Sequence, residues 1–153
     1  MKNYVKTKTI LSERDEDLCV DIFRNIMRAR HAMYQMAGGV AERAGLHAAE
    51  LNVVDILGKF GPMSMGRLAS ETFISAANTT NTVKKLELTS LVKRKRSDVS
   101  ARQVTVSLTA KGQAIFRKCY PRILADAHEH LACRLTQAEK ADLSQILAKL
   151  TSS

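Results

Sequence analysis

The side chains best suited to chemistry lie between residues 75 and 102, and most are hydrogen-bond donors or cations. The spacing predicts a helix from Ala76 to about Ser90, capped by Ser75, with Thr79, Val83 and Leu86 on one side. The opposite side carries polar and basic residues: Asn78, Thr80, Asn81, Lys84 and Lys85. Groups of this kind contact phosphate oxygens and base edges, so the pattern predicts DNA binding.

A run of four cations, Lys93 to Arg96, follows this helix. From Lys84 to Lys111 there are eight lysines and arginines against two acids, in a chain of formal net charge +9. A basic run alone is usually a solvated face. Because this run follows a capped polar helix directly, we interpret it as a surface that contacts phosphates.

The neighbouring segments indicate how these residues are positioned. Ser64 to Thr72 predicts a short helix, and Phe73-Ile74 breaks it before the next helix. Leu91-Val92 begins a strand, a small polar segment forms a hairpin tip, and apolar residues alternate from Val104 to Leu108. The order predicts a winged helix-turn-helix, in which the second helix enters the major groove and the hairpin follows the backbone.

The stretch from Leu68 to Gly112 resembles the MarR (multiple-antibiotic-resistance) family of transcriptional regulators. The resemblance is carried by spacing without insertion and by the strand that ends in VSLTAKG before a long helix. The residues that match are Leu68, Ala69, Ser75, Val83, Leu86, Glu87, Leu91, Val92, Arg102, Val106, Ser107, Leu108, Thr109, Lys111 and Gly112. The resemblance implies a homodimer, whose interleaved terminal helices form a base for two winged lobes.

Two departures from the family pattern affect the DNA contacts. The family's wing usually carries Asp-x-Arg, whereas this chain has Ser100, Ala101 and Arg102, so the acidic brace is lost. Ala76 and Asn81 stand where many members have basic or larger polar residues. The residues expected to contact DNA are Ser75, Ala76, Asn78, Thr80, Asn81, Lys84, Lys85, Arg94, Lys95, Arg96 and Arg102.

The rest of the chain predicts helices that flank this lobe. A helix from Ser12 to about Met36, ended by Gly38-Gly39, and a helix from Leu46 to Phe60 precede it. After it, Thr109 caps a long helix that Pro121 should kink or break, and Thr136 to Glu139 form a capping box for a last helix. The expectation is a single mainly α domain, 1–153, with a small β-hairpin wing. Its winged lobe is 46–108, and its dimerisation helices are 12–36 and 109–150.

Other candidate chemistry is sparse. Cys19 lies among acidic residues, which disfavour a reactive thiolate, so it is expected to be a packing residue, as are Cys119 and Cys133. His128 and His130 point away from each other on a helix, and no metal site is expected. The family resemblance implies a cleft for small aromatic or phenolic effectors near the junction of the first two helices. Its candidate contacts are His31, Tyr34 and His47; a surface role for the two histidines stays open.

Length and composition set the remaining expectations. A chain of 153 residues that is 45% hydrophobic can bury a core, and it has neither a membrane-length apolar run nor a visible secretion signal. Its three widely spaced cysteines favour a reducing cytoplasm. No catalytic motif or cofactor site is visible, so an enzyme is not expected. We therefore expect a sequence-specific, homodimeric regulator, an effector-responsive repressor acting on an inverted repeat. The alternatives are a nonspecific architectural DNA-binding protein and a winged-helix module for protein assembly.

Overall fold

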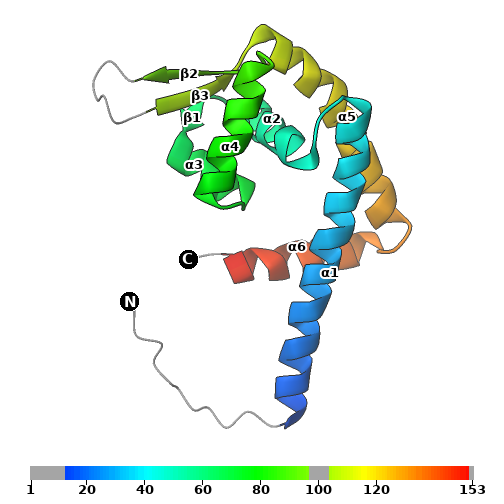
Figure 1. The fold of residues 1–153 in the computed structure, drawn as a ribbon. Helices are drawn as coiled ribbons and strands as arrows, with labels where there is room; N and C mark the ends of the chain where they lie inside the picture. The colour runs from blue at the N-terminus through cyan, green and yellow to red at the C-terminus, as the bar shows by residue number, and fades with distance from the viewer. Residues whose placement is uncertain (1–12, 97–103, 152–153) are drawn as a thin grey trace, which may run out of the picture. The chain divides into compact units, whose positions relative to one another are not determined.

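The computed structural model describes residues 13–96 and 104–151, and it contains six helices and three strands in these ranges. The elements in chain order are α1 (Glu13–Arg43), α2 (Ala48–Phe60), β1 (Met63–Ser64), α3 (Met65–Thr72), α4 (Ala76–Leu88), β2 (Val92–Arg96), β3 (Val104–Leu108), α5 (Ala110–Ala132) and α6 (Gln137–Thr151). Figure 1 labels them. The mainly α class with a small hairpin is confirmed.

Helix α1 continues past the two glycines that were expected to end it. It runs to Arg43, so the predicted stop at Gly38-Gly39 is wrong. A helical glycine costs about 1 kcal/mol relative to alanine. The cost is offset because Val40 and Ala41, 4% and 0% exposed, pack with Leu51 and Cys119 in a buried cluster.

The chain divides into two compact units within this helix. The first ends at Tyr34, and the second is Gln35–Ser153. In the first unit the large apolar side chains of α1 are exposed: Leu18, Val20, Ile22, Phe23, Ile26, Met27, Met33 and Tyr34. The described residues of this unit, from Glu13 on, therefore leave the wide apolar band of the sequence uncovered.

The second unit contains a three-stranded antiparallel sheet in the order β1-β3-β2. The predicted hairpin is confirmed, with Val92 opposite Leu108 and Arg96 opposite Val104. Strand β1 was not predicted, because two residues are too short to show a period. Met63 lies opposite Val106 and adds its buried side chain to the core.

One hydrophobic core joins α2, α3, α4 and the sheet. Its buried members are Val53, Val54, Leu57, Met63, Leu68, Val83, Leu86, Leu91, Val92, Val106 and Leu108. Helix α2 supplies Val53, Val54 and Leu57 and so supports the helix-turn-helix from behind. It begins two residues later than predicted and ends at Gly61, whose φ of 78° suits glycine.

The last two helices begin as predicted. The Thr109 hydroxyl accepts from the Gly112 amide at 3.1 Å, and α5 continues through Pro121 without a break. At α6, the Thr136 amide donates to Glu139 Oε2 at 2.8 Å, and the Glu139 amide donates back to the Thr136 hydroxyl at 3.3 Å. The capping box is therefore confirmed.

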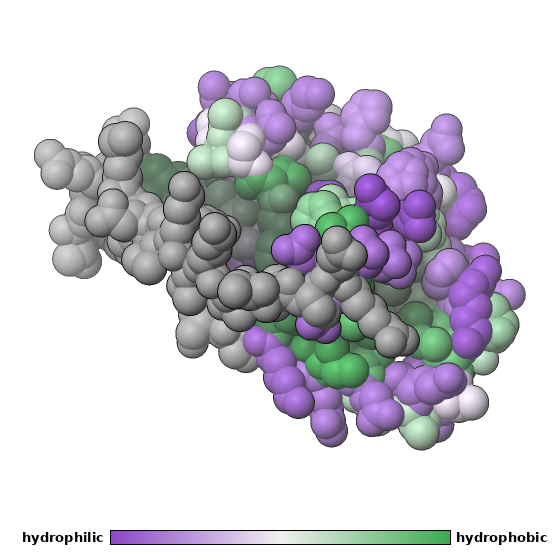
Figure 2. Space-filling view, turned by 90° about the horizontal axis from the view of Figure 1, so that it is seen from below, coloured by the Kyte–Doolittle hydropathy of each residue, from purple (hydrophilic) through white to green (hydrophobic). Residues whose placement is uncertain are grey.

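Helix α6 has no buried residue. Its apolar side chains Leu143, Ile146, Leu147 and Leu150 are all exposed. Figure 2 shows hydrophobic atoms, in green, reaching the surface among hydrophilic side chains. Within residues 13–96 and 104–151, no helix is long and apolar enough to cross a membrane.

Candidate nucleic-acid interface

Helix α4 presents the polar face that its sequence predicts. The Ser75 hydroxyl accepts from the Asn78 amide at 3.3 Å, which confirms the cap. The inner face is buried through Thr79, Thr82, Val83 and Leu86. The exposed side chains of the opposite face are Ala76, Asn78, Asn81, Lys84 and Lys85, with Thr80 half-buried. The predicted donors and cations of α4 therefore share one accessible surface.

The turn between α3 and α4 is held by buried threonines. The Thr72 hydroxyl donates to the Leu68 carbonyl at 2.8 Å and lies 3.4 Å from the Thr79 hydroxyl. The Asn52 amide of α2 donates to the Thr72 carbonyl at 3.1 Å. These contacts fix the angle at which α4 leaves the turn.

Phe73, at the same turn, has an uncommon conformation. Its φ of 55° and ψ of 27° are left-handed, and its side chain is 84% exposed. A left-handed non-glycine residue costs about 1–2 kcal/mol. No burial of the ring offsets this cost in the described residues.

Arg94 of β2 reaches back to α4. Its Nε donates to Glu87 Oε2 at 2.8 Å, and its Nη2 contacts the same oxygen. The hydrogen bond from Arg94 lowers the pKa of the Glu87 carboxyl below its usual range. A DNA contact by Arg94 would therefore compete with Glu87.

The structure describes only some of the other basic side chains in and near the wing. Lys93 and Lys95 are exposed on β2. The side chain of Arg96, the hairpin tip and Arg102 lie outside the described residues. Lys111, counted in the basic stretch, donates from Nζ to the Thr89 carbonyl at 2.9 Å, so it ties α5 to the end of α4.

The expected effector residues do not form one site within a single unit. His31 and Tyr34 lie in the first unit, and both are exposed. His47, in the second, precedes α2, and its amide donates to Glu50 Oε2 at 2.9 Å. A cavity of about 620 Å³ lies beside it. The residues that line this cavity are Gln35, Gly38, Gly39, Glu42, Gly45, Leu46, His47 and Ala48.

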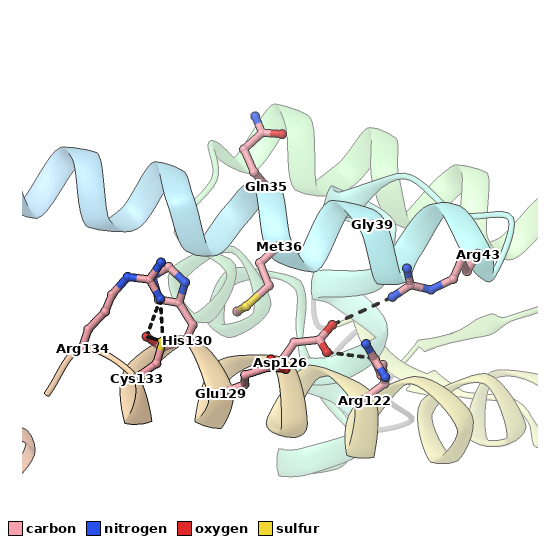
Figure 3. A pocket seen from close by; sticks show the side chains of 10 residues that line it. All are labelled: Gln35, Met36, Gly39, Arg43, Arg122, Asp126, Glu129, His130, Cys133 and Arg134. Atoms are coloured by element: carbon pink, nitrogen blue, oxygen red, sulfur yellow. Dashed lines mark hydrogen bonds and ion pairs between the residues drawn. The ribbon is translucent and has the colours of Figure 1, made fainter. Parts of the chain in front are cut away.

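A second cavity, of about 570 Å³, lies between the end of α1 and α5 and is rich in charged groups. Figure 3 shows Asp126 between two arginines, with Arg122 Nε 2.8 Å and Arg43 Nη2 3.9 Å from its carboxylate. Arg134 Nη1 lies 3.0 Å from Cys133 Sγ and 2.9 Å from the His130 carbonyl. Both cavities are large enough for a small aromatic molecule.

The burial of the cysteines agrees only in part with the prediction that all three are packing residues. Cys119 is buried as predicted, and burial raises the pKa of its thiol. Cys133 is exposed, so the prediction that it packs inside the fold is wrong for the residues that the structure describes. Cys19 is exposed too, and no described residue of its unit buries it. Among the residues that the structure describes, no group of three or more His, Cys, Asp or Glu could hold a metal ion.

Sequence reasoning missed two residues of this region. Glu87 was counted as a charge against the basic run and as one of the residues that carry the family resemblance, but no local pattern connects it to Arg94 seven positions later. Phe73 was recognised as part of a helix break, but a break does not reveal a left-handed residue with an exposed ring. Both adjoin the polar face of α4.

The chain is similar to known transcriptional regulators. The sequence model of the MarR family matches residues 44–103. The regulator MgrA of Staphylococcus aureus is 26% identical over 137 residues, 88% of each chain. Mutant MarR from E. coli complexed with operator DNA has a TM-score of 0.78 at 21% identity, covering 89% of this chain and 97% of that one. NadR in complex with 4-hydroxyphenylacetate has a TM-score of 0.73 at 21% identity, covering 84% and 91%.

These relatives are regulators and not enzymes, in agreement with the expectation from the sequence. The comparisons and the observed winged helix-turn-helix together confirm the predicted resemblance to the MarR family: the family's sequence model matches residues 44–103, and the chain shares the fold of the solved MarR structure.

Proposed function

We propose that the protein is a sequence-specific, DNA-binding transcriptional repressor that acts as a homodimer and responds to a small effector. The observation that carries this proposal is the exposed polar and basic face of α4, capped by Ser75, beside the cationic strand β2. A helix of this kind, followed by a hairpin, fits a major groove with its flanking phosphates. The operator complex of the E. coli relative supports the same mode of binding.

The residues of the interface take two roles. Asn78, Thr80, Asn81 and Lys84 would read base edges, because amides pair with adenine and lysine with guanine in the major groove. Ser75, Ala76 and Lys85 would lie against the same groove, and the wing residues Lys93 to Arg96 and Arg102 would hold the flanking backbone. The base contacts would give specificity, and the phosphate contacts affinity.

The uncovered apolar faces support the proposal of a homodimer. Side chains such as Phe23 in α1 and Leu150 in α6 are 65% and 62% exposed, and each belongs to a row of apolar neighbours. Exposed rows of this kind mark interaction surfaces, and a second copy of the chain presents the same rows. We propose that α1, α5 and α6 form the dimer base, including the extension of α1 to Arg43.

An effector would act through the cavities near α1. NadR was solved with 4-hydroxyphenylacetate, an aromatic acid, and this chain offers His47 at one cavity and several arginines at the other. His31 and Tyr34 are further candidate contacts. A ligand that binds better to one arrangement of the lobes would shift the spacing of the recognition helices and so the affinity for DNA.

Selection from a random pool of duplexes tests the proposal. Two recognition helices related by a twofold axis lie about 34 Å apart, so the selected sites should be inverted repeats with half-site centres about 10 base pairs apart. A thermal-shift and DNA-release assay with 4-hydroxyphenylacetate then tests the effector. A pool that yields no common sequence would favour the alternative, a nonspecific DNA-coating protein. Failure to bind DNA even at modest salt would favour a protein-assembly module.

A further inference from the structure

An exposed apolar edge lies at the N-terminal end of α4. Phe73 projects from the turn before the helix, and the first two helical residues, Ala76 and Ala77, are also exposed. Figure 1 places this turn between α3 and α4. None of these three side chains has a group that can donate to or accept from a base or a phosphate.

The conformation of Phe73 argues that its ring has a role. Its backbone is left-handed, a state that glycine and asparagine adopt with much less strain. Its ring is 84% exposed, so the fold gains little from it. A strained residue whose side chain is left in solvent points to function when it lies beside a binding surface.

The position of the Phe73 ring indicates which chemical group of the DNA it would contact. In helix-turn-helix proteins the N-terminal residues of the recognition helix approach the base edges. Phe73 lies two residues before the capping Ser75, and therefore at the leading edge of α4. In the major groove the apolar group of the base edges is the 5-methyl of thymine, and Phe and Ala side chains are suited to contact it.

We propose that Phe73, together with the methyl groups of Ala76 and Ala77, packs against a thymine 5-methyl group in each half-site, and so makes that thymine a specificity determinant. This inference rests on the proposed function. It adds a residue that the polar pattern of α4 could not reveal, and it names the chemical group that the residue reads.

Deoxyuridine substitution tests the contact, because it removes the methyl group and keeps every hydrogen-bonding group of thymine. Each thymine of the selected operator would be replaced in turn, symmetrically in both half-sites. One methyl transferred from water is worth about fourfold in affinity, so the contacted pair should give about fifteenfold weaker binding of the wild-type protein. For Phe73→Gly the same substitution should have a clearly smaller effect.

Two controls distinguish the loss of a methyl contact from misfolding of the variant or a general effect of removing an exposed apolar side chain. Glycine and asparagine both accept the left-handed backbone, so Phe73→Gly and Phe73→Asn should melt no lower than the wild type. Leu88→Ala removes an equally exposed apolar side chain, 86% exposed, from the other end of α4, and it should keep the full sensitivity to deoxyuridine.

The outcomes are distinct. Deoxyuridine sensitivity at one position that Phe73→Gly reduces supports the inference. Full sensitivity in Phe73→Gly, or no sensitivity at any thymine, overturns it while the proposed function stands. If the pool yields no specific operator, the proposed function fails and this inference fails with it.

Discussion

Arg94 and Glu87 join the wing to the recognition helix: Arg94 Nε, on β2, lies 2.8 Å from Glu87 Oε2, on α4. The two side chains are about one-third exposed. This pair connects the two elements that are proposed to contact the groove and the backbone. It therefore ties β2 to α4 in the absence of DNA, in addition to the core contacts of Val92.

Removal of the Glu87 charge should weaken the fold only where that carboxyl is ionised. Because Arg94 lowers the pKa of Glu87, the pair contributes stability above the ordinary glutamate value of 4.5 and loses it as pH falls through the lowered folded value. Glu87→Gln should therefore unfold more easily than the wild type at pH 7, and the difference should disappear in strong acid. Urea unfolding of both proteins at pH 7 and in strong acid measures this difference in the free energy of unfolding.

A double-mutant cycle with Arg94→Met is the control. If the pair accounts for the effect, the second substitution should add little to the first at pH 7. A difference that persists unchanged in acid would show that Glu87 acts through something other than its ion pair.

Arg94 should contribute less to the salt dependence of DNA binding than Lys85 does. Each phosphate contact changes the slope of log K against log salt by about 0.9. Lys85→Ala should reduce the slope by about this amount per recognition helix. Arg94→Ala should reduce it less, because Glu87 already holds the guanidinium. Equal reductions, measured by fluorescence anisotropy over a salt series, would show that Arg94 leaves Glu87 for a phosphate.

Local signals predicted much of the fold. The caps at Ser75, Thr109 and Thr136 were identified correctly because a cap depends on residues three positions apart. The alternation from Val104 to Leu108 likewise identified β3. Tertiary packing decided the cases that failed: α1 passes through Gly38-Gly39 because residues beyond them are buried.

The candidate site was predicted less completely than the fold. The polar face of α4 follows from helical periodicity alone. The Glu87–Arg94 pair depends on how a strand returns beside a helix, and the left-handed state of Phe73 depends on the turn geometry. Neither is encoded in a short-range pattern.

Gly112 should tolerate no side chain. An added Cβ would overlap the Leu91 carbonyl oxygen and contact Leu108, where α5 begins against the sheet. Gly112→Ala should therefore lower the free energy of unfolding by about 1–3 kcal/mol. Gly66 in α3 is the matched control, because its Cβ would meet open space. Gly66→Ala should raise the free energy of unfolding by about 0.4–1 kcal/mol in the same denaturant titration.

A charge placed on the apolar face of α6 should separate the proposed dimer. Ile146 and Leu150 are 53% and 62% exposed in the chain, so glutamate there costs the isolated fold little. Ile146→Glu with Leu150→Glu should give a monomer in sedimentation equilibrium and lose tight DNA binding. Lys149→Glu, which makes the same total change of charge on the same helix, should stay dimeric if it lies off the interface. An unchanged mass for the double variant would exclude α6 from the dimer base.

The ratio of affinities for the selected operator and for a shuffled duplex of equal length and composition tests the central claim most directly. A regulator that reads bases through α4 should bind the operator at least about a thousandfold more tightly at physiological salt. Replacement of Asn78 and Asn81 by alanine should reduce that ratio more than it reduces binding to the shuffled duplex. A ratio near one for the wild-type protein would show that the basic surface coats DNA without reading it, and would contradict the account.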